Sequence, residues 1–254
     1  MSRTVQVRNL WIGEGMPKIC IPLLGRTQEE ILAAAANAAS EVPDLLEWRV
    51  DWYEQHGDSE AVVELLFQLR QEIGTLPLLF TFRTRQDGGE AEISAEAYVR
   101  LNREAMATGM TDLVDVELSQ GEEALQELIA AAHERDVAVV VSCHDFEKTP
   151  SQAEMVSIMC RMQELGADIP KLAVMPQSDS DVIALINATH EMRMEHDDTP
   201  VITMSMGVKG SITRLGGETF GSAVTFASVG QESAPGQIGI TELRQMLAIL
   251  YQGV

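Results

Sequence analysis

Basic residues, cysteines and long apolar runs are all scarce in this sequence of 254 residues. Lysine and arginine number 18 against 39 aspartates and glutamates, which gives a formal net charge of −21. So acidic a chain repels polyphosphates and anionic lipid surfaces, and we therefore expect no nucleic-acid partner and no membrane partner. A small anionic substrate is compatible with this charge, because a few buried cations can dominate one pocket.

The low cysteine count and the lack of long apolar runs indicate the cellular compartment. The three cysteines, Cys20, Cys143 and Cys160, form no C-x-x-C motif, and an odd number fits no closed disulfide framework. The opening MSRTVQVRNLWIGEG has no apolar segment typical of a secretory signal, and no run of about 18 apolar residues predicts a membrane span. We expect free thiols in a reducing, cytoplasmic setting.

Cofactor motifs are missing as well. No G-x-G-x-x-G follows the first predicted strand, and Walker A, G-x-S-x-G and H-E-x-x-H motifs are absent. No cysteine and histidine cluster has zinc spacing. We therefore expect neither a metal nor a nucleotide cofactor.

The sequence does contain a regular alternation of apolar, β-rich segments with segments of helical spacing. The starts of the strands lie 22 to 36 residues apart, which is the length of a βα unit. Eight such units most often close into a (β/α)8 TIM barrel, which we predict as one α/β domain over residues 1–254. An open doubly wound sheet is the alternative. The predicted strands are 18–24, 45–51, 77–83, 113–118, 137–144, 170–175, 201–206 and 223–229.

Capping residues mark the helices between these strands. Thr27 and Glu30 form a predicted capping box at the start of helix 28–39. The segment 211–221 is short and rich in glycine. Segment 3–12 alternates like a strand, and we expect an N-terminal hairpin that closes the barrel bottom, with Gly13 and Gly15 in its turn. The other predicted helices are 60–73, Ser94 to about Gly109, Ser151 to Gly166, 178–196, and Thr241 or earlier to about 252.

Charged residues inside the apolar strands are the candidate site residues. In strand 45–51, Leu46 and Trp48 fit the helix layer, so Glu47, Arg49 and Asp51 should point into the barrel. Buried charges cost several kcal/mol each unless they pair. These three residues form either a self-satisfied ion network or a polar floor that binds substrate hydroxyls. Arg83 at the end of strand 77–83 is a candidate clamp for an anion or a hydroxyl.

His144 and Lys171 are the candidates for chemistry. His144 lies where strand 137–144 meets a loop, the usual place of catalytic residues in a barrel. Its neighbour Cys143 faces the other way by strand alternation, which argues against a Cys/His pair. Lys171 shares parity with Ala173 and should then lie in a small apolar interior, where a neutral amine can form a Schiff base with a ketone or aldehyde. The alternatives are a structural histidine and a lysine that reaches solvent at the barrel bottom.

Residues after the last two strands complete the candidate mouth. Arg214 is a candidate carboxylate clamp with bidentate geometry. Ser233 and Gln237 flank a Pro-Gly turn that can hold a hydroxyl and an amide over the barrel, or form a plain surface turn. Met204 and Met206 are more typical of core packing.

Taken together, these segments resemble the type I 3-dehydroquinate dehydratases, the Schiff-base class, over essentially the full length. The family is the source of the substrate named below, which composition and spacing do not provide. The matching segments are LLEWRVD, FTFRT followed by DGGE, SCHDF, PKLAVMP, TMSMG, SITRLGGETFGSAVTF and SAPGQI.

The resemblance implies a homodimeric (β/α)8 barrel without cofactor that dehydrates 3-dehydroquinate to 3-dehydroshikimate. Lys171 would form the imine at C3, and His144 would move a proton from C2 to the departing C1 hydroxyl. The substrate-binding set would be Arg214, Ser233 and Gln237 at the carboxylate, Glu47, Arg49 and Arg83 at the hydroxyls and carbonyl region, and Met204 and Met206 along an apolar wall.

One position departs from the family pattern, which has Glu in the loop after the third strand, paired with the catalytic histidine. This sequence has Asp87 there, one methylene shorter, and we expect it to orient His144 through a looser bond.

Two other functions fit parts of the sequence. A class I aldolase or transaldolase-like enzyme also uses a barrel lysine, and a non-catalytic barrel would bind a metabolite or a partner without turnover.

Overall fold

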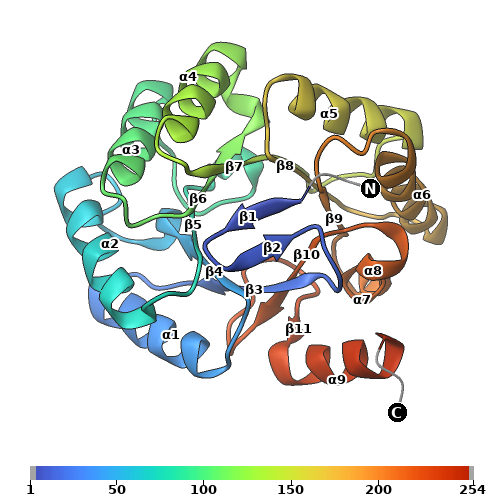
Figure 1. Cartoon of the computed structure of the whole chain (residues 1–254), viewed down its shortest axis with the longest axis horizontal. Helices are drawn as coiled ribbons and strands as arrows, with labels where there is room; N and C mark the ends of the chain where they lie inside the picture. The colour runs from blue at the N-terminus through green and yellow to red at the C-terminus, as the bar shows by residue number, and fades with distance from the viewer. Residues whose placement is uncertain (1–3, 252–254) are drawn as a thin grey trace.

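Eight parallel strands close into a barrel in the computed structural model, which describes residues 4–251. Their order is β10-β3-β4-β5-β6-β7-β8-β9. The ring closes where the Ala223 N–H donates to the Val201 carbonyl at 2.8 Å, just ahead of β10 and β9. The predicted (β/α)8 barrel is confirmed and the open sheet is excluded (Figure 1). The strands are β3 (Lys18–Leu23), β4 (Leu45–Arg49), β5 (Leu78–Thr81), β6 (Leu113–Glu117), β7 (Ala138–Asp145), β8 (Ile169–Val174), β9 (Ile202–Ser205) and β10 (Val224–Ser228).

Helices surround the barrel and begin close to their predicted caps. The Thr27–Glu30 capping box is present, and the Ser94 and Ser151 hydroxyls accept backbone N–H groups at the starts of α3 and α5. Two single-turn helices, α7 and α8, replace a full helix after β9, as the glycine-rich segment indicated. The helices are α1 (Gln28–Ser40), α2 (Ser59–Ile73), α3 (Ala95–Ala107), α4 (Glu122–His133), α5 (Gln152–Glu164), α6 (Asp179–Glu195), α7 (Ile212–Leu215), α8 (Gly217–Phe220) and α9 (Ile240–Tyr251).

A hairpin of β1 (Val5–Val7) and β2 (Leu10–Ile12) crosses one end of the barrel (Figure 1). The predicted hairpin is confirmed, but its turn lies at Arg8 and Asn9, where Arg8 has a φ of 54°. Gly13 and Gly15 instead connect β2 to β3, both with positive φ. A Cβ on Gly13 would lie 2.9 Å from Pro200 Cβ, so this connection needs glycine because it passes close to the start of β9. Arg3 lies outside the described residues.

The barrel interior has an apolar lower layer and a charged upper layer. Leu45, Leu113, Ile169 and Ile202, at the strand starts, pack together over Ile12 of the hairpin, which closes this end. Above them lie the ionisable side chains of β4 to β8, at the carboxyl ends of the strands, where barrel enzymes carry their sites. The apolar layer therefore seals one end of the barrel and leaves the other end for polar chemistry.

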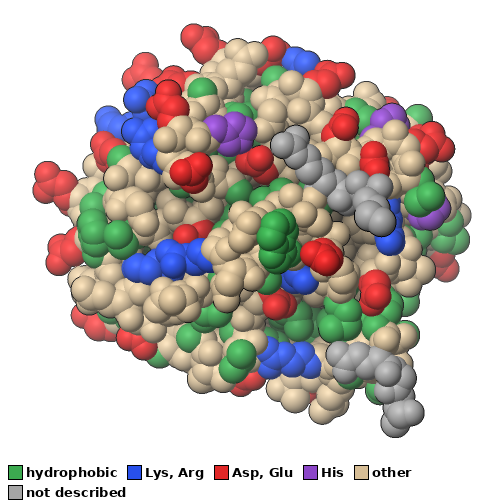
Figure 2. All heavy atoms as spheres, in the orientation of Figure 1, with side chains coloured by type: hydrophobic (Ala, Val, Ile, Leu, Met, Phe, Trp, Pro, Cys, Tyr) green, Lys and Arg blue, Asp and Glu red, His purple; other side chains and the backbone are tan. Residues whose placement is uncertain are grey.

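The outer surface of the hairpin end is polar. Aspartate and glutamate side chains are spread around its rim, with fewer lysines and arginines between them (Figure 2). Across residues 4–251, no helix has the length and apolarity needed to cross a membrane.

Candidate active site

Strand parity sorts the side chains of β4 as predicted. Leu46 and Trp48 pack in the helix layer, whereas Glu47 and Arg49 point into the barrel and are buried. Asp51 has left the strand and lies in a 3-10 turn over Val50–Trp52. Its carboxylate accepts two bonds from Arg49, Nε at 2.8 Å and Nη2 at 2.7 Å. It also accepts the backbone N–H of Arg83 and of Glu90, so it ties the end of β4 to the loop after β5.

Lys171 points into the charged layer, and its surroundings differ from those predicted. Its Nζ lies 3.1 Å from Asp115 Oδ2 and 3.7 Å from Glu47 Oε1, and 4.8 Å from the centre of the Phe226 ring. The side chain is 5% exposed, so it does not reach solvent at the barrel bottom. The prediction of a small apolar interior is wrong, because β6 contributes a carboxylate beside the amine.

Asp115 and Glu117 of β6 are site residues that the sequence interpretation missed. Both are fully buried. They alternate with Val114 and Val116, which pack in the helix layer, so the parity argument used for β4 would have identified them.

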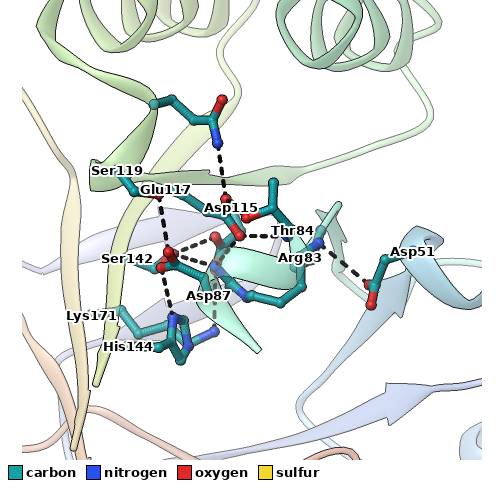
Figure 3. A network of polar contacts seen from close by, with 12 residues as sticks. Asp51, Arg83, Thr84, Asp87, Asp115, Glu117, Ser119, Ser142, His144 and Lys171 are labelled. Carbon is teal, nitrogen blue, oxygen red and sulfur yellow. Dashed lines mark hydrogen bonds and ion pairs between the residues drawn. The ribbon is translucent and has the colours of Figure 1, made fainter. Parts of the chain in front are cut away.

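Arg83 lies between these two carboxylates (Figure 3). Its Nη2 forms an ion pair with Asp115 Oδ2 at 2.8 Å, and its Nη1 contacts Glu117 Oε1 at 3.1 Å. Burial opposes the charge of the guanidinium, but the two carboxylates more than offset burial and raise the pKa of Arg83. Burial likewise disfavours charge on Asp115, yet Arg83 and Lys171 lower its pKa. Arg83 and Asp115 therefore stabilise each other's charged form inside the barrel.

His144 lies near the end of β7 and faces Lys171 and Asp87 across the mouth (Figure 3). Its Nδ1 is 3.5 Å from Asp87 Oδ2, forms no hydrogen bond, and is buried. Burial, followed by the charges of Arg83, Lys171 and Arg49, lowers the pKa of His144 well below its ordinary value. The imidazole is therefore neutral at physiological pH and can accept a proton.

Cys143 packs among helix-layer residues, as strand alternation predicts. Burial, with the nearby Asp87 carboxylate, raises the pKa of its thiol to about 11. A thiol is a poor nucleophile when so little of it is ionised. The side-chain direction and the pKa both argue against a Cys/His pair at this site.

Arg214 lies beneath the loop after β10, beside the cavity rather than on its wall. It is 2% exposed, and its Nη2 donates to the Pro235 carbonyl at 3.1 Å. Its Nε has no hydrogen-bond partner, and burial lowers the pKa of Arg214 to about 10. Ser233 and Gln237 bind each other, with Gln237 Nε2 donating to Ser233 Oγ at 2.8 Å. The hydrogen bonds hold the loop over a buried cation whose charge Glu232 of the same loop favours, although among the described residues no carboxylate forms an ion pair with it.

These side chains surround one cavity at the carboxyl ends of the strands. Within residues 4–251, no three His, Cys, Asp or Glu side chains are placed to hold a metal ion. Apart from Arg214, every predicted site residue lines the cavity: Glu47, Arg49, Arg83, Asp87, His144, Lys171, Met204, Met206, Ser233 and Gln237.

A (β/α)8 barrel that gathers ionisable side chains in a cavity at the carboxyl ends of its strands has the architecture of a barrel enzyme. A family model described as type I 3-dehydroquinase matches residues 19–254. The chain belongs to the type I 3-dehydroquinase family. A 3-dehydroquinate dehydratase of Clostridioides difficile (strain 630) is 49% identical over 254 residues, covering 100% of each chain. A counterpart from Klebsiella pneumoniae (strain 342) is 48% identical, covering 98% of this chain and 100% of its own length.

Solved structures agree with this assignment. The type I enzyme of Clostridium difficile with covalently modified comenic acid superposes with a TM-score of 0.97 at 49% identity, covering 100% of both chains. A 3-dehydroquinate dehydratase from Geobacillus kaustophilus gives a TM-score of 0.96 at 41% identity, covering 99% of both chains. The barrel topology is thus shared over the whole chain.

Proposed function

We propose that this chain dehydrates 3-dehydroquinate to 3-dehydroshikimate through an imine on Lys171. The observation that carries the proposal is the placement of Lys171 Nζ in the same buried mouth as the neutral His144 imidazole. Family membership adds the substrate, since the relatives described above carry this activity in their names. The product is the enone together with one water molecule.

The proposed sequence of steps begins with Lys171. His144 takes one proton from the Lys171 ammonium, and the amine attacks the C3 carbonyl. The carbonyl oxygen takes that proton from His144 and a second one from the nitrogen, and leaves as water to give the iminium. The iminium withdraws electrons and acidifies the C2 protons. His144 removes one of them, and the enamine then expels the C1 hydroxyl, which takes that proton from His144 and departs as water. Water finally hydrolyses the new iminium and returns free Lys171.

The other residues bind and orient. We assign the ring hydroxyls and the carbonyl region to Glu47, Arg49 and Arg83, whose side chains are held by ion pairs and hydrogen bonds. We assign the carboxylate to Arg214 with Ser233 and Gln237, since the guanidinium lies buried without an anionic partner. Met204 and Met206 provide the apolar wall. Asp87 orients His144 from 3.5 Å, which is consistent with a looser bond than the family glutamate would make.

The family resemblance also supports proposals about the assembly, the location and the domain organisation of the protein. We propose a homodimer in the cytoplasm, in which residues 1–254 form one domain. Analytical ultracentrifugation over a range of concentrations tests the assembly, and a species of one chain's mass, 27.8 kDa, at all concentrations would contradict it.

The deciding experiment is intact mass spectrometry after borohydride treatment with and without 3-dehydroquinate. We expect a ligand-dependent adduct that peptide mapping locates on Lys171, and none in Lys171→Ala. Lys209, an exposed lysine paired with Asp179, provides the matched control as Lys209→Ala, which should still trap the substrate. A folded protein that forms no adduct and shows no turnover would refute the proposal, and sugar phosphates would then be tried as aldolase substrates.

A further inference from the structure

Ser119 lies one turn beyond β6, in the 3-10 segment Leu118–Gln120, and reaches toward the catalytic mouth from outside. Its Oγ donates to Asp87 Oδ1 at 3.0 Å, while Asp87 Oδ2 faces His144 Nδ1 (Figure 3). We propose that Ser119 is a positioning residue that fixes the Asp87 carboxylate for its work on His144. This inference rests on the proposed function and extends it by one residue.

The need for such a residue follows from the length of the aspartate side chain. Asp87 stands where the family pattern has glutamate, and its Oδ2 stops 3.5 Å short of His144 Nδ1. A carboxylate at this distance orients the imidazole only if its own rotation is restricted. Ser119 binds the far oxygen, and so turns the near oxygen toward the ring. Asp87 Oδ1 is thus bound by Ser119, and Asp87 Oδ2 faces His144.

The hydrogen bond from Ser119 also lowers the pKa of Asp87, which its surroundings otherwise raise. Burial raises the pKa of Asp87, against which Arg83 and the Ser119 hydroxyl act, while Asp115 adds to the rise. Loss of the Ser119 hydroxyl therefore raises the pKa of Asp87 further, against the lowering by Arg83 and by the backbone N–H of His144 that remains. Once protonated, Asp87 cannot support a protonated imidazole. The charged and titratable groups that face Asp87 are Arg83 of the β5 end, Asp115 and Glu117 of β6, and Cys143 and His144 of β7.

Ser119 is well suited to a test because it is exposed, whereas Asp87 is only 5% exposed. Deleting its hydroxyl opens no cavity in the core, so Ser119→Ala should fold with unchanged stability. We expect the acid limb of its kcat profile to move to higher pH. On that limb, kcat should fall about three- to tenfold, the range for one hydrogen bond to a charged group. Ser119→Thr keeps the hydroxyl and should restore the profile.

A double-mutant cycle shows whether Ser119 acts through Asp87. In an Asp87→Asn background the carboxylate cannot ionise, so adding Ser119→Ala should leave the pH profile unchanged. Ser40, an exposed serine whose hydroxyl binds the Asn37 carbonyl, provides the matched deletion Ser40→Ala, and its profile should match the parent protein.

Two outcomes would overturn the inference. One is an unshifted acid limb in Ser119→Ala, which would mean that water replaces the hydroxyl. The other is a shift of equal size in the Asp87→Asn background, which would mean that Ser119 acts elsewhere. Failure of the proposed function would look different, because the parent protein would then not turn over 3-dehydroquinate at any pH.

Discussion

Lys171 Nζ and Asp115 Oδ2 are 3.1 Å apart, and the same carboxylate oxygen forms an ion pair with Arg83 at 2.8 Å. One fully buried acid therefore contacts two buried cations, one proposed to react and one proposed to bind. Its second oxygen accepts from Ser142 Oγ at 2.6 Å, so the carboxylate is held on both sides. The position of the Lys171 amine thus depends on β6, through the Asp115 carboxylate.

Asp115→Asn should reduce both stability and imine formation. The neutral amide leaves Arg83 and Lys171 undercompensated in the barrel, and breaking a buried pair costs about 3 kcal/mol. We expect a loss of that size in chemical denaturation and a slower approach to the borohydride-trapped adduct. Glu92→Gln removes an acid from an exposed pair with Arg85 and should change neither measurement. Equal effects of the two substitutions would contradict a special place for Asp115.

The pH profile of kcat/KM should report a histidine that stays neutral in mild acid. The environment lowers the pKa of His144 well below 6.5, so its base form persists as the pH falls. The acid limb should accordingly lie below pH 6.5, the ordinary value for histidine. An Arg49→Gln variant removes one of the cations that lower this pKa and should move the limb upward. A limb at or above pH 6.5 in the parent protein would contradict a neutral, buried His144.

The barrel was predictable because βα units have a regular length and a strict side-chain alternation. All eight strands were found, and parity correctly placed Glu47 and Arg49 inside and Cys143 outside. The hairpin turn was misplaced because Gly13 has its positive φ for a close approach to Pro200 rather than for reversing the chain. Local sequence does not distinguish these two uses of glycine.

The surroundings of Lys171 depended on side chains far away in the sequence. Asp115 is 56 residues from Lys171, and only the curl of the sheet brings side chains of β6 and β8 together inside the barrel, across the intervening β7. Ser119 gave no signal of its own, since a serine after a strand is ordinary, and its contact with Asp87 depends on the path of two loops. The hydrogen-bond partners of a site are therefore less predictable than the residues that point into it.

Gly88→Ala should impair catalysis through Phe146. Gly88 has a φ of 83°, and a Cβ there would overlap the Phe146 ring, which stacks on His144 at 6.3 Å between centroids. The ring must move, and the imidazole with it, so we expect kcat to fall about tenfold or more. Gly109→Ala imposes similar backbone strain, because the φ of Gly109 is 68°, but no atom lies within 4 Å of the added Cβ. This variant therefore shows the effect of backbone strain without displacement of a side chain. If both variants lose the same fraction of kcat, Phe146 is not involved.

Arg214→Met should weaken substrate binding without weakening the fold. The guanidinium is buried with an unpartnered Nε, and within residues 4–251 its charge is favoured only by Glu232, which forms no ion pair with it and does not offset burial, so the free protein gains little from this charge. Methionine fills a similar volume and removes that burial cost, so chemical denaturation should show a free energy of unfolding equal to or above that of the parent protein. The KM for 3-dehydroquinate should rise about 10- to 100-fold, since a charge-assisted bidentate contact is lost. Arg193→Met, at the opposite end of the barrel, removes bonds to the Glu218 and Thr219 carbonyls and should leave KM unchanged. A destabilised Arg214→Met protein with normal KM would mean that Arg214 serves only to hold the Pro235 carbonyl, and the carboxylate would then have to bind elsewhere in the mouth.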